Sequence, residues 1–111
     1  YGGLGNDEIY GEGADSLLFG DAGDDYLGSE GARTSVYGGD GADTLSVSGP
    51  GIADGGADDD RIIILGGTSV RVFGGAGNET ILWNGGTGMI RAGTGDDQIE
   101  GWTGSRMVAF G

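Results

Sequence analysis

Short phrases that join glycines to a carboxylate recur along this chain at a spacing close to eighteen residues. The clearest copies are residues 2–7 (GGLGND), 20–25 (GDAGDD) and 38–43 (GGDGAD). Weaker copies follow at residues 55–60, 74–79 and 92–97. Calcium takes carboxylate and carbonyl oxygens, and glycine lets the backbone bend so that several carbonyls converge. The sequence therefore predicts a column of hard-cation sites.

The turn carboxylates define the step of this column. They are Asp7, Asp25, Asp43, Asp60, Glu79 and Asp97, separated by 18, 18, 17, 19 and 18 residues. Self-similarity at a fixed period is the signature of a solenoid, in which repeats bury a core only by stacking. Six stacked turns leave five gaps, so we expect up to five Ca²⁺ ions between successive turns of this kind.

An apolar ladder with half that period indicates the elements that position the turns. Apolar residues nine apart fit short strands between tight glycine turns, two strands to a coil, and do not fit a helix. The ladder is expected to point inward and to be broken at Asp54. Its members are Ile9, Leu18, Leu27, Val36, Leu45, Ile63, Val72, Ile81, Ile90, Ile99 and Val108.

The two half-coils differ in their turns. In every second row, other residues replace the turn aspartate, so we expect metal along one edge of the solenoid only. The replacements are Ser16, Thr34, Ile52, Val70, Gly88 and Arg106. Around residues 46–65 the spacing changes by one residue and recovers in the next coil, which predicts a local bulge inside a single domain, 1–111.

Composition excludes several classes of function. The chain has 18 acidic and 5 basic residues, with no lysine, so nucleic-acid binding is not expected. Histidine and cysteine are absent, which removes the usual nucleophile–base pairs and thiolate metal sites, and we expect no enzyme activity. No apolar run is long enough for membrane insertion.

Aromatic residues recur in the strands that lack the metal turn. Phe19, Tyr37 and Phe73 share one position and are expected to face outward as a stripe, which could contact a neighbouring domain or another copy of the chain. The alternative is that these strands simply cover part of the core. The same prediction extends to further large residues of these rows: Leu17, Met89, Met107, Trp83 and Trp102.

The repeated phrase resembles the calcium-binding nonapeptide of RTX (haemolysin-type) proteins, Gly-Gly-x-Gly-x-Asp-x-apolar-x, over essentially the whole chain. The resemblance implies an all-β fold, a right-handed parallel β-roll of about six 18-residue coils. It also implies a secreted bacterial protein that folds on binding Ca²⁺ after export. Aspartates of the turns would supply carboxylates, and neighbouring turn residues would supply carbonyls. The implied site residues are Gly2, Leu4, Gly5, Asp7, Gly20, Ala22, Gly23, Asp25, Gly38, Asp40, Gly41, Asp43, Gly55, Ala57, Asp60, Gly74, Ala76, Gly77, Glu79, Gly95 and Asp97.

Some features depart from the family pattern. β-Rolls of this family usually bind calcium along both edges, Glu79 is longer than aspartate, and Asp58 and Ala92 replace turn glycines. The turn aspartates could also serve only to cap turns by hydrogen bonds. An adhesive spacer, or an accessory module of a secreted enzyme, would fit the same repeats. Because the chain begins and ends within the repeats, we expect it to be a segment of a longer protein.

Overall fold

The computed structural model describes residues 1–66, 69–101 and 106–110, the last segment by its backbone alone. The described residues form two parallel sheets and no helix. They therefore include no helix that is long and apolar enough to cross a membrane. The seven-stranded sheet comprises β1 (Gly3–Leu4), β3 (Leu17–Ala22), β5 (Thr34–Asp40), β7 (Gly51–Ala57), β9 (Val70–Ala76), β11 (Thr87–Thr94) and β13 (Arg106–Phe110). The six-stranded sheet comprises β2 (Glu8–Glu12), β4 (Tyr26–Glu30), β6 (Thr44–Ser48), β8 (Arg61–Gly66), β10 (Thr80–Trp83) and β12 (Gln98–Gly101).

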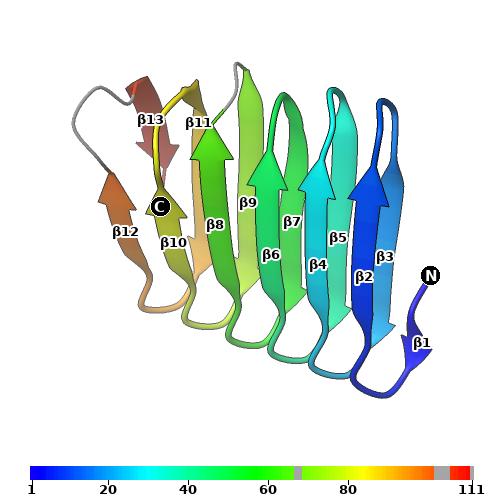
Figure 1. Cartoon of the computed structure of the whole chain (residues 1–111). Helices are drawn as coiled ribbons and strands as arrows, with labels where there is room; N and C mark the ends of the chain where they lie inside the picture. The colour runs from blue at the N-terminus through cyan, green and yellow to red at the C-terminus, as the bar shows by residue number, and fades with distance from the viewer. Residues whose placement is uncertain (67–68, 102–105, 111) are drawn as a thin grey trace.

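The chain alternates between the two sheets and advances by one strand in each per coil. Figure 1 shows this right-handed path, with β2 rising in front, β3 descending behind and the next coil beside it. The result is a β-solenoid of about five turns with about 18 residues per turn. Six copies of the motif give five complete turns, because a turn is complete only when the chain returns to the same corner. The all-β, parallel β-roll prediction is confirmed.

The core is a thin apolar layer between the sheets. In the six-stranded sheet, Leu27, Leu45 and Ile81 are fully buried, and Val36 and Val72 face them from the seven-stranded sheet with 0% and 1% exposed. Each such side chain contributes about 1.5–3 kcal/mol through burial. Because both neighbours of a coil are needed to cover it, the stack rather than any single repeat is the stable unit.

The predicted ladder is wrong in the middle of the chain. Ile63 was expected inside and Asp54 was expected to interrupt the ladder, but both are half-buried and lie outside it. The ladder continues instead through Ala53 and Ile62, which are fully buried and pair with Val36 and Leu45. The shift to a 17-residue spacing therefore moves the inward position one residue earlier.

The cause of the shift is a short corner. Residues 31–33 connect β4 to β5, whereas only Gly49 and Pro50 connect β6 to β7. The lost residue is recovered in β8, where Val47 pairs with Ile64 but Ser48 pairs with Gly66. Leu65 is thus an extra residue that bulges outward and is 51% exposed, as the spacing predicted for a local bulge.

The outward faces are largely as predicted, with one correction. Phe19, Tyr37 and Phe73 alternate with buried neighbours, and Phe19 stacks on Tyr37 with ring centroids 5.1 Å apart. Trp83 was expected outside but lies in β10 and is completely buried. Its row belongs to the other sheet, in the column that also holds Ile64. Leu17 is exposed, whereas the side chains of Met107 and Val108, and Trp102 altogether, lie outside the described residues.

Candidate metal centre

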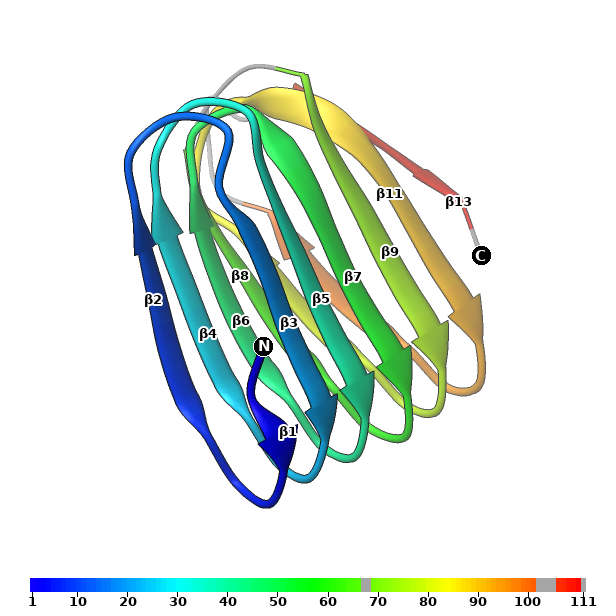
Figure 2. The same ribbon diagram turned by 90° about the vertical axis from the view of Figure 1, so that its right-hand side faces the viewer.

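All predicted turn carboxylates lie along one edge of the solenoid. They occupy the corners that lead from the seven-stranded sheet to the six-stranded sheet, which form the lower rim in Figure 1 and Figure 2. Four of them, Asp25, Asp43, Asp60 and Glu79, are at most 3% exposed. Asp7 and Asp97, at the two ends of the column, are half-buried. Burying an ionised carboxylate is unfavourable unless its charge is compensated. The neighbours of each carboxylate oxygen therefore show what stabilises it.

One oxygen of these carboxylates holds successive coils together. Oδ1 of Asp25 accepts a hydrogen bond from the backbone N–H of Asp7 at 2.7 Å, and Oδ1 of Asp43 accepts one from Asp25 at 2.8 Å. The same bond joins Asp43 to Asp60 at 2.9 Å and Glu79 to Asp97 at 3.0 Å. The capping role considered for the turn aspartates is therefore real, but it uses only one of the two oxygens.

The second oxygen has no hydrogen-bond partner. Oδ2 of Asp7, Asp25, Asp43 and Asp60 is buried and unpaired. It faces the Cα of a glycine in its own coil and the carbonyl oxygen of the glycine one coil further on. A methyl group placed on Gly20, for example, would lie 2.5 Å from Asp25 Oδ2 and 2.5 Å from the carbonyl oxygen of Gly38. A carboxylate oxygen without a donor and a backbone carbonyl oxygen thus border one small space, which is an environment that a cation stabilises.

This arrangement repeats in every gap, and we call each instance a cradle. The pairs of converging oxygens are Asp7 Oδ2 with Gly20 O, Asp25 Oδ2 with Gly38 O, Asp43 Oδ2 with Gly55 O, Asp60 Oδ2 with Gly74 O, and Glu79 Oε2 with Ala92 O. The glycines Gly2, Gly20, Gly38, Gly55 and Gly74 leave the cradles open because any side chain there would fill them. Ala92 stands at the same position in the last coil and brings a methyl group to it.

The cradles suit calcium by their chemistry. No group of three or more His, Cys, Asp or Glu side chains able to hold a metal is found among the described residues, so side chains alone do not form a site. Each cradle instead combines a carboxylate oxygen with a backbone carbonyl oxygen, which are ligands for a hard, oxygen-seeking ion. A thiophilic or imidazole-seeking metal finds no ligand in a chain without cysteine and histidine.

The other predicted site residues lie at the same edge. Leu4, Ala22, Asp40, Ala57 and Ala76 are stacked in register at the ends of their strands. The following turn glycines Gly5, Gly23, Gly41, Gly77 and Gly95 all have positive φ, and the carbonyls of Gly5, Gly23 and Gly77 approach the glycine of the next turn. Asp58 takes this position in one coil with φ of 78°, a conformation that aspartate tolerates better than most residues.

The metal-free column is electrostatically strained. Burial raises the pKa of Asp43 from 3.8 to about 6, and the neighbouring carboxylate of Asp25 contributes to the rise. Burial and the adjacent Asp43 carboxylate likewise raise the pKa of Asp60 to about 7. Burial is also the largest cause that raises the pKa of Glu79, from 4.5 to about 7. The column therefore binds protons more tightly than free carboxylates do, and a bound cation would relieve the same repulsion.

Glu79 interrupts the ladder of Oδ1 bonds. Both of its carboxylate oxygens are buried without a hydrogen-bond partner. Its extra methylene moves Oε2 to 3.0 Å from the position that a methyl group on Gly74 would take, compared with 2.5 Å for Asp25 at Gly20. In the Glu79 cradle the carboxylate oxygen is therefore further from this point and the carbonyl oxygen of Ala92 is closer, at 2.1 Å. The Asp60 coil is not tied to Glu79 through the carboxylate.

A second ladder lies on the outside of the same turns, and sequence reasoning did not predict it. Asn6 Oδ1 accepts the N–H of Asp24 at 2.8 Å, and Asp24 Oδ1 accepts the N–H of Ala42 at 2.9 Å. Asp59 and Asn78 continue it after the break that the short side chain of Ala42 causes. These bonds run from a later coil to an earlier one, opposite to the inner ladder. The signal in the sequence was an amide or carboxylate just before the turn acid.

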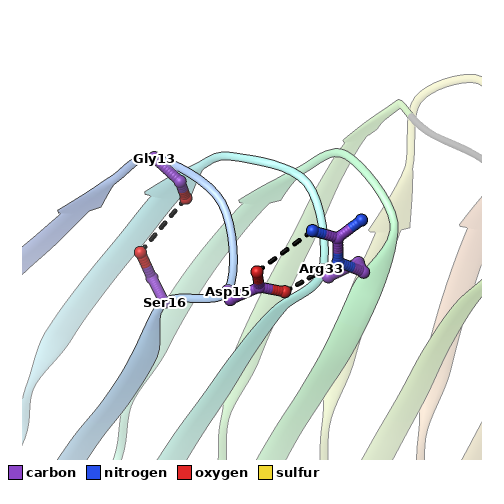
Figure 3. Close-up of polar contacts among 4 residues, drawn as sticks. All are labelled: Gly13, Asp15, Ser16 and Arg33. Carbon is purple, nitrogen blue, oxygen red and sulfur yellow. Dashed lines mark hydrogen bonds and ion pairs between the residues drawn. The ribbon is translucent and has the colours of Figure 1, made fainter.

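The opposite edge has no comparable cradle among its described corners. Figure 3 shows its main polar contacts, where Arg33 pairs with Asp15 through bonds of 2.7 and 3.0 Å, and Ser16 donates to the carbonyl of Gly13 at 3.1 Å. The guanidinium lowers the pKa of Asp15. Both partners are about two-thirds exposed, so this pair adds little stability. The carboxylate here is already neutralised by an arginine.

Fold and site together define a β-solenoid with oxygen-lined cation cradles along one edge. The family model of the RTX calcium-binding nonapeptide repeat matches four copies in this chain, at residues 1–31, 35–49 and 84–105. The chain belongs to this family and is a calcium-binding β-roll module. No curated protein and no solved structure matched it significantly. The unmatched stretch, residues 50–83, begins at Pro50 of the short corner and contains the Leu65 bulge and Glu79.

Proposed function

We propose that this module folds on binding calcium after export from a bacterial cell, with up to five ions in the five cradles. The observation that carries the proposal is the repeated pairing of an unpartnered buried Oδ2 with a carbonyl oxygen across each gap. Inside the cell, where calcium is scarce, the module remains extended. After export it becomes compact, because calcium is abundant outside the cell. It acts by binding and stiffening rather than by catalysis.

Charge supports this coupling. The formal net charge is −13, and the carboxylates are stacked one coil apart along the edge. Parallel strands are about 4.8 Å apart, at which distance like charges repel by about 1 kcal/mol in water and by more when partly buried. Five Ca²⁺ ions would leave a net charge of about −3. The metal therefore removes most of the repulsion that opposes stacking.

The test is a calcium titration followed by far-UV circular dichroism and by tryptophan fluorescence. Trp83 is completely buried between the sheets, so in a Trp102→Phe background the emission reports packing of the core. We expect a cooperative gain of β signal and a blue shift of the emission with calcium. Magnesium, which accepts a carbonyl-rich cradle poorly, should give neither at the same concentration, and a chelator should reverse both.

A β spectrum and Trp83 emission that do not change on chelation would show that the ladder alone holds the fold. A calcium-binding module could then still exist, but without coupled folding. Equilibrium dialysis of the folded protein would separate these results, since it counts bound ions independently of any conformational change.

A second function is favoured by the aromatic stripe, which we define as Phe19, Tyr37 and Phe73. Tyr1 and Tyr37 stack on the two sides of Phe19, with centroids 4.8 and 5.1 Å away, so an ordered and partly exposed aromatic surface lies on the seven-stranded sheet. We propose that it contacts a neighbouring domain or another copy of the chain. The mass of the calcium-loaded module in solution tests self-association, and Phe19→Ser should abolish any that is found.

A further inference from the structure

A shallow groove crosses the outer face of the six-stranded sheet, away from the metal edge and from the aromatic stripe. It has a volume of about 160 Å³ and lies over Gly28, between Tyr10 and Tyr26 on one side and Leu65 on the other. We call it the tyrosine groove. Gly28 is required for its shape, because a Cβ there would lie 3.1 Å from the Tyr10 ring. The bulge in β8 supplies the opposite wall by turning Leu65 outward.

The tyrosine rings are held in place but are not covered. Their centroids are 5.8 Å apart and the ring planes are inclined by 50°. The hydroxyl of Tyr10 donates a hydrogen bond to the carboxylate of Glu8, which fixes the ring from its far end. Tyr10 is nevertheless 63% exposed and Tyr26 38% exposed. Two π faces are therefore presented to solvent in a fixed arrangement that the core does not need.

The groove is also negatively charged without compensation. Glu12 and Glu30 line it and are direct register partners on β2 and β4. Like charges placed opposite each other on neighbouring strands destabilise a sheet. Neither glutamate has a hydrogen bond or an ion pair within the part of the chain that the structure describes, and the chain has no lysine. Arg61 lies on the same face of the sheet but on β8, two strands away from Tyr26: Tyr26 pairs with Thr44, and Thr44 pairs with Arg61.

We propose that the tyrosine groove binds an alkylammonium group, the chemistry of a lysine side chain or of a choline-type headgroup. A cation over a tyrosine face is attracted by the ring quadrupole, and more strongly when carboxylates are near. The groove provides two such faces and two glutamates, in a hollow that accommodates a headgroup but not a folded segment. Its charge disfavours anions, and neutral ligands would leave the Glu12–Glu30 repulsion in place.

The experiment uses the whole module in saturating calcium and at physiological ionic strength. ¹⁵N-labelled protein is titrated separately with Nα-acetyl-lysine methylamide, which keeps the side-chain ammonium, and with choline, and the amide chemical shifts of the protein are followed. We expect saturable shifts at Tyr10, Tyr26 and Gly28 with millimolar affinity. Tighter binding of the lysine derivative would assign the groove to a lysine side chain, and tighter binding of choline to a quaternary headgroup. Saturation by neither probe overturns the proposal.

Variants separate a built site from general attraction to an acidic protein. Tyr10→Leu keeps the bulk but removes one π face, and should weaken binding by about 3- to 10-fold. Glu100→Gln, on β12 at the far end of the same sheet, is the control for general charge and should leave the affinity unchanged. Circular dichroism in calcium verifies that both variants are folded. If Tyr10→Leu binds like the wild type, while Glu12→Gln with Glu30→Gln abolishes binding, the groove is only an acidic pair and the proposal fails.

Discussion

Replacing Asp43 by asparagine should have opposite effects on stability with and without calcium. Asp43 is in the middle of the column, with 1% of its surface exposed. Its Oδ1 accepts the N–H of Asp25 at 2.8 Å, and its unpartnered Oδ2 faces the carbonyl oxygen of Gly55. Asparagine keeps the Oδ1 acceptor, removes the charge and can donate its amide to that carbonyl. It loses only the anionic ligand.

The effect of Asp43→Asn on the stability of the metal-free protein follows from the pKa of Asp43. A rise from 3.8 to about 6 corresponds to roughly 3 kcal/mol at a pH above both values, at 1.36 kcal/mol per unit. Asp43 lies in a corner at the rim of the solenoid, where nearby solvent screens charges, so we expect about 1–3 kcal/mol. Asp43→Asn should therefore stabilise the metal-free protein by that amount. With calcium at about 100 times the dissociation constant, an occupied site contributes about 2.7 kcal/mol, which the variant forfeits.

Urea unfolding at about pH 8 measures both effects, in a chelator and in saturating calcium, with Trp83 emission as the signal. The control is Asp54→Asn, because burial also raises the pKa of Asp54 but this residue lies on the outer sheet face. The control should stabilise the protein in both conditions, and slightly more in chelator, because the charge of Asp54 also contributes to the raised pKa of Asp60. If Asp43→Asn destabilises the metal-free protein, or if its effect does not depend on calcium, the assignment of Oδ2 to the metal is wrong.

The remaining predictions address the cradle, the ladder and pH. Gly20→Ala should abolish calcium binding in one gap, because its methyl group fills the cradle, and dialysis should count one ion fewer than in the wild type. Glu79→Asp should stabilise the protein by about 1 kcal/mol in calcium and in chelator alike, by restoring an inner-ladder bond, and urea unfolding in both conditions measures this gain. Ile62→Ala should cost about 2–5 kcal/mol and Ile63→Ala clearly less, so equal urea midpoints would contradict the corrected register. In chelator, the folded-state pKa of Asp60 is above its unfolded value, so its contribution to stability is complete below about pH 4 and lost as pH rises through about 7. The metal-free protein should thus resist urea better in acid, and a midpoint that rises with pH would refute this.

The period and the one-sided edge could be predicted because the turn chemistry repeats in every coil. A positive-φ glycine and a turn acid must return at each corner, so their spacing in the sequence reflects the coil directly. The register around β8 could not be predicted in this way. A residue missing at Gly49–Pro50 is compensated by the extra Leu65, and the continuous run Ile62, Ile63, Ile64, Leu65 has no polar alternation to show which side faces inward.

The different roles of the two oxygens of each turn carboxylate also could not be predicted from the sequence. An aspartate at a turn fits both a metal ligand and a turn cap, and only the hydrogen-bond directions show that Oδ1 caps while Oδ2 stays open. The outer ladder was missed for a related reason. Asn6 and Asp24 look unlike as ligands, because one is neutral and one is charged. They serve equally as acceptors of a backbone N–H, since both carry an Oδ1 atom.

The inner carboxylates couple neighbouring cradles mechanically. Asp43 is bonded through Oδ1 to the preceding coil and, through Oδ2, lines the gap to the following coil, so one side chain links three coils. A cation that fixes Asp43 in one gap also fixes the backbone of Asp25, whose carboxylate lines the previous gap. Occupation of one cradle therefore prepares the next toward the N-terminus. This chain of contacts is broken between Asp60 and Glu79, because Glu79 accepts no hydrogen bond. Calcium binding should accordingly be cooperative in the cradles up to Asp60 and independent of them at Glu79.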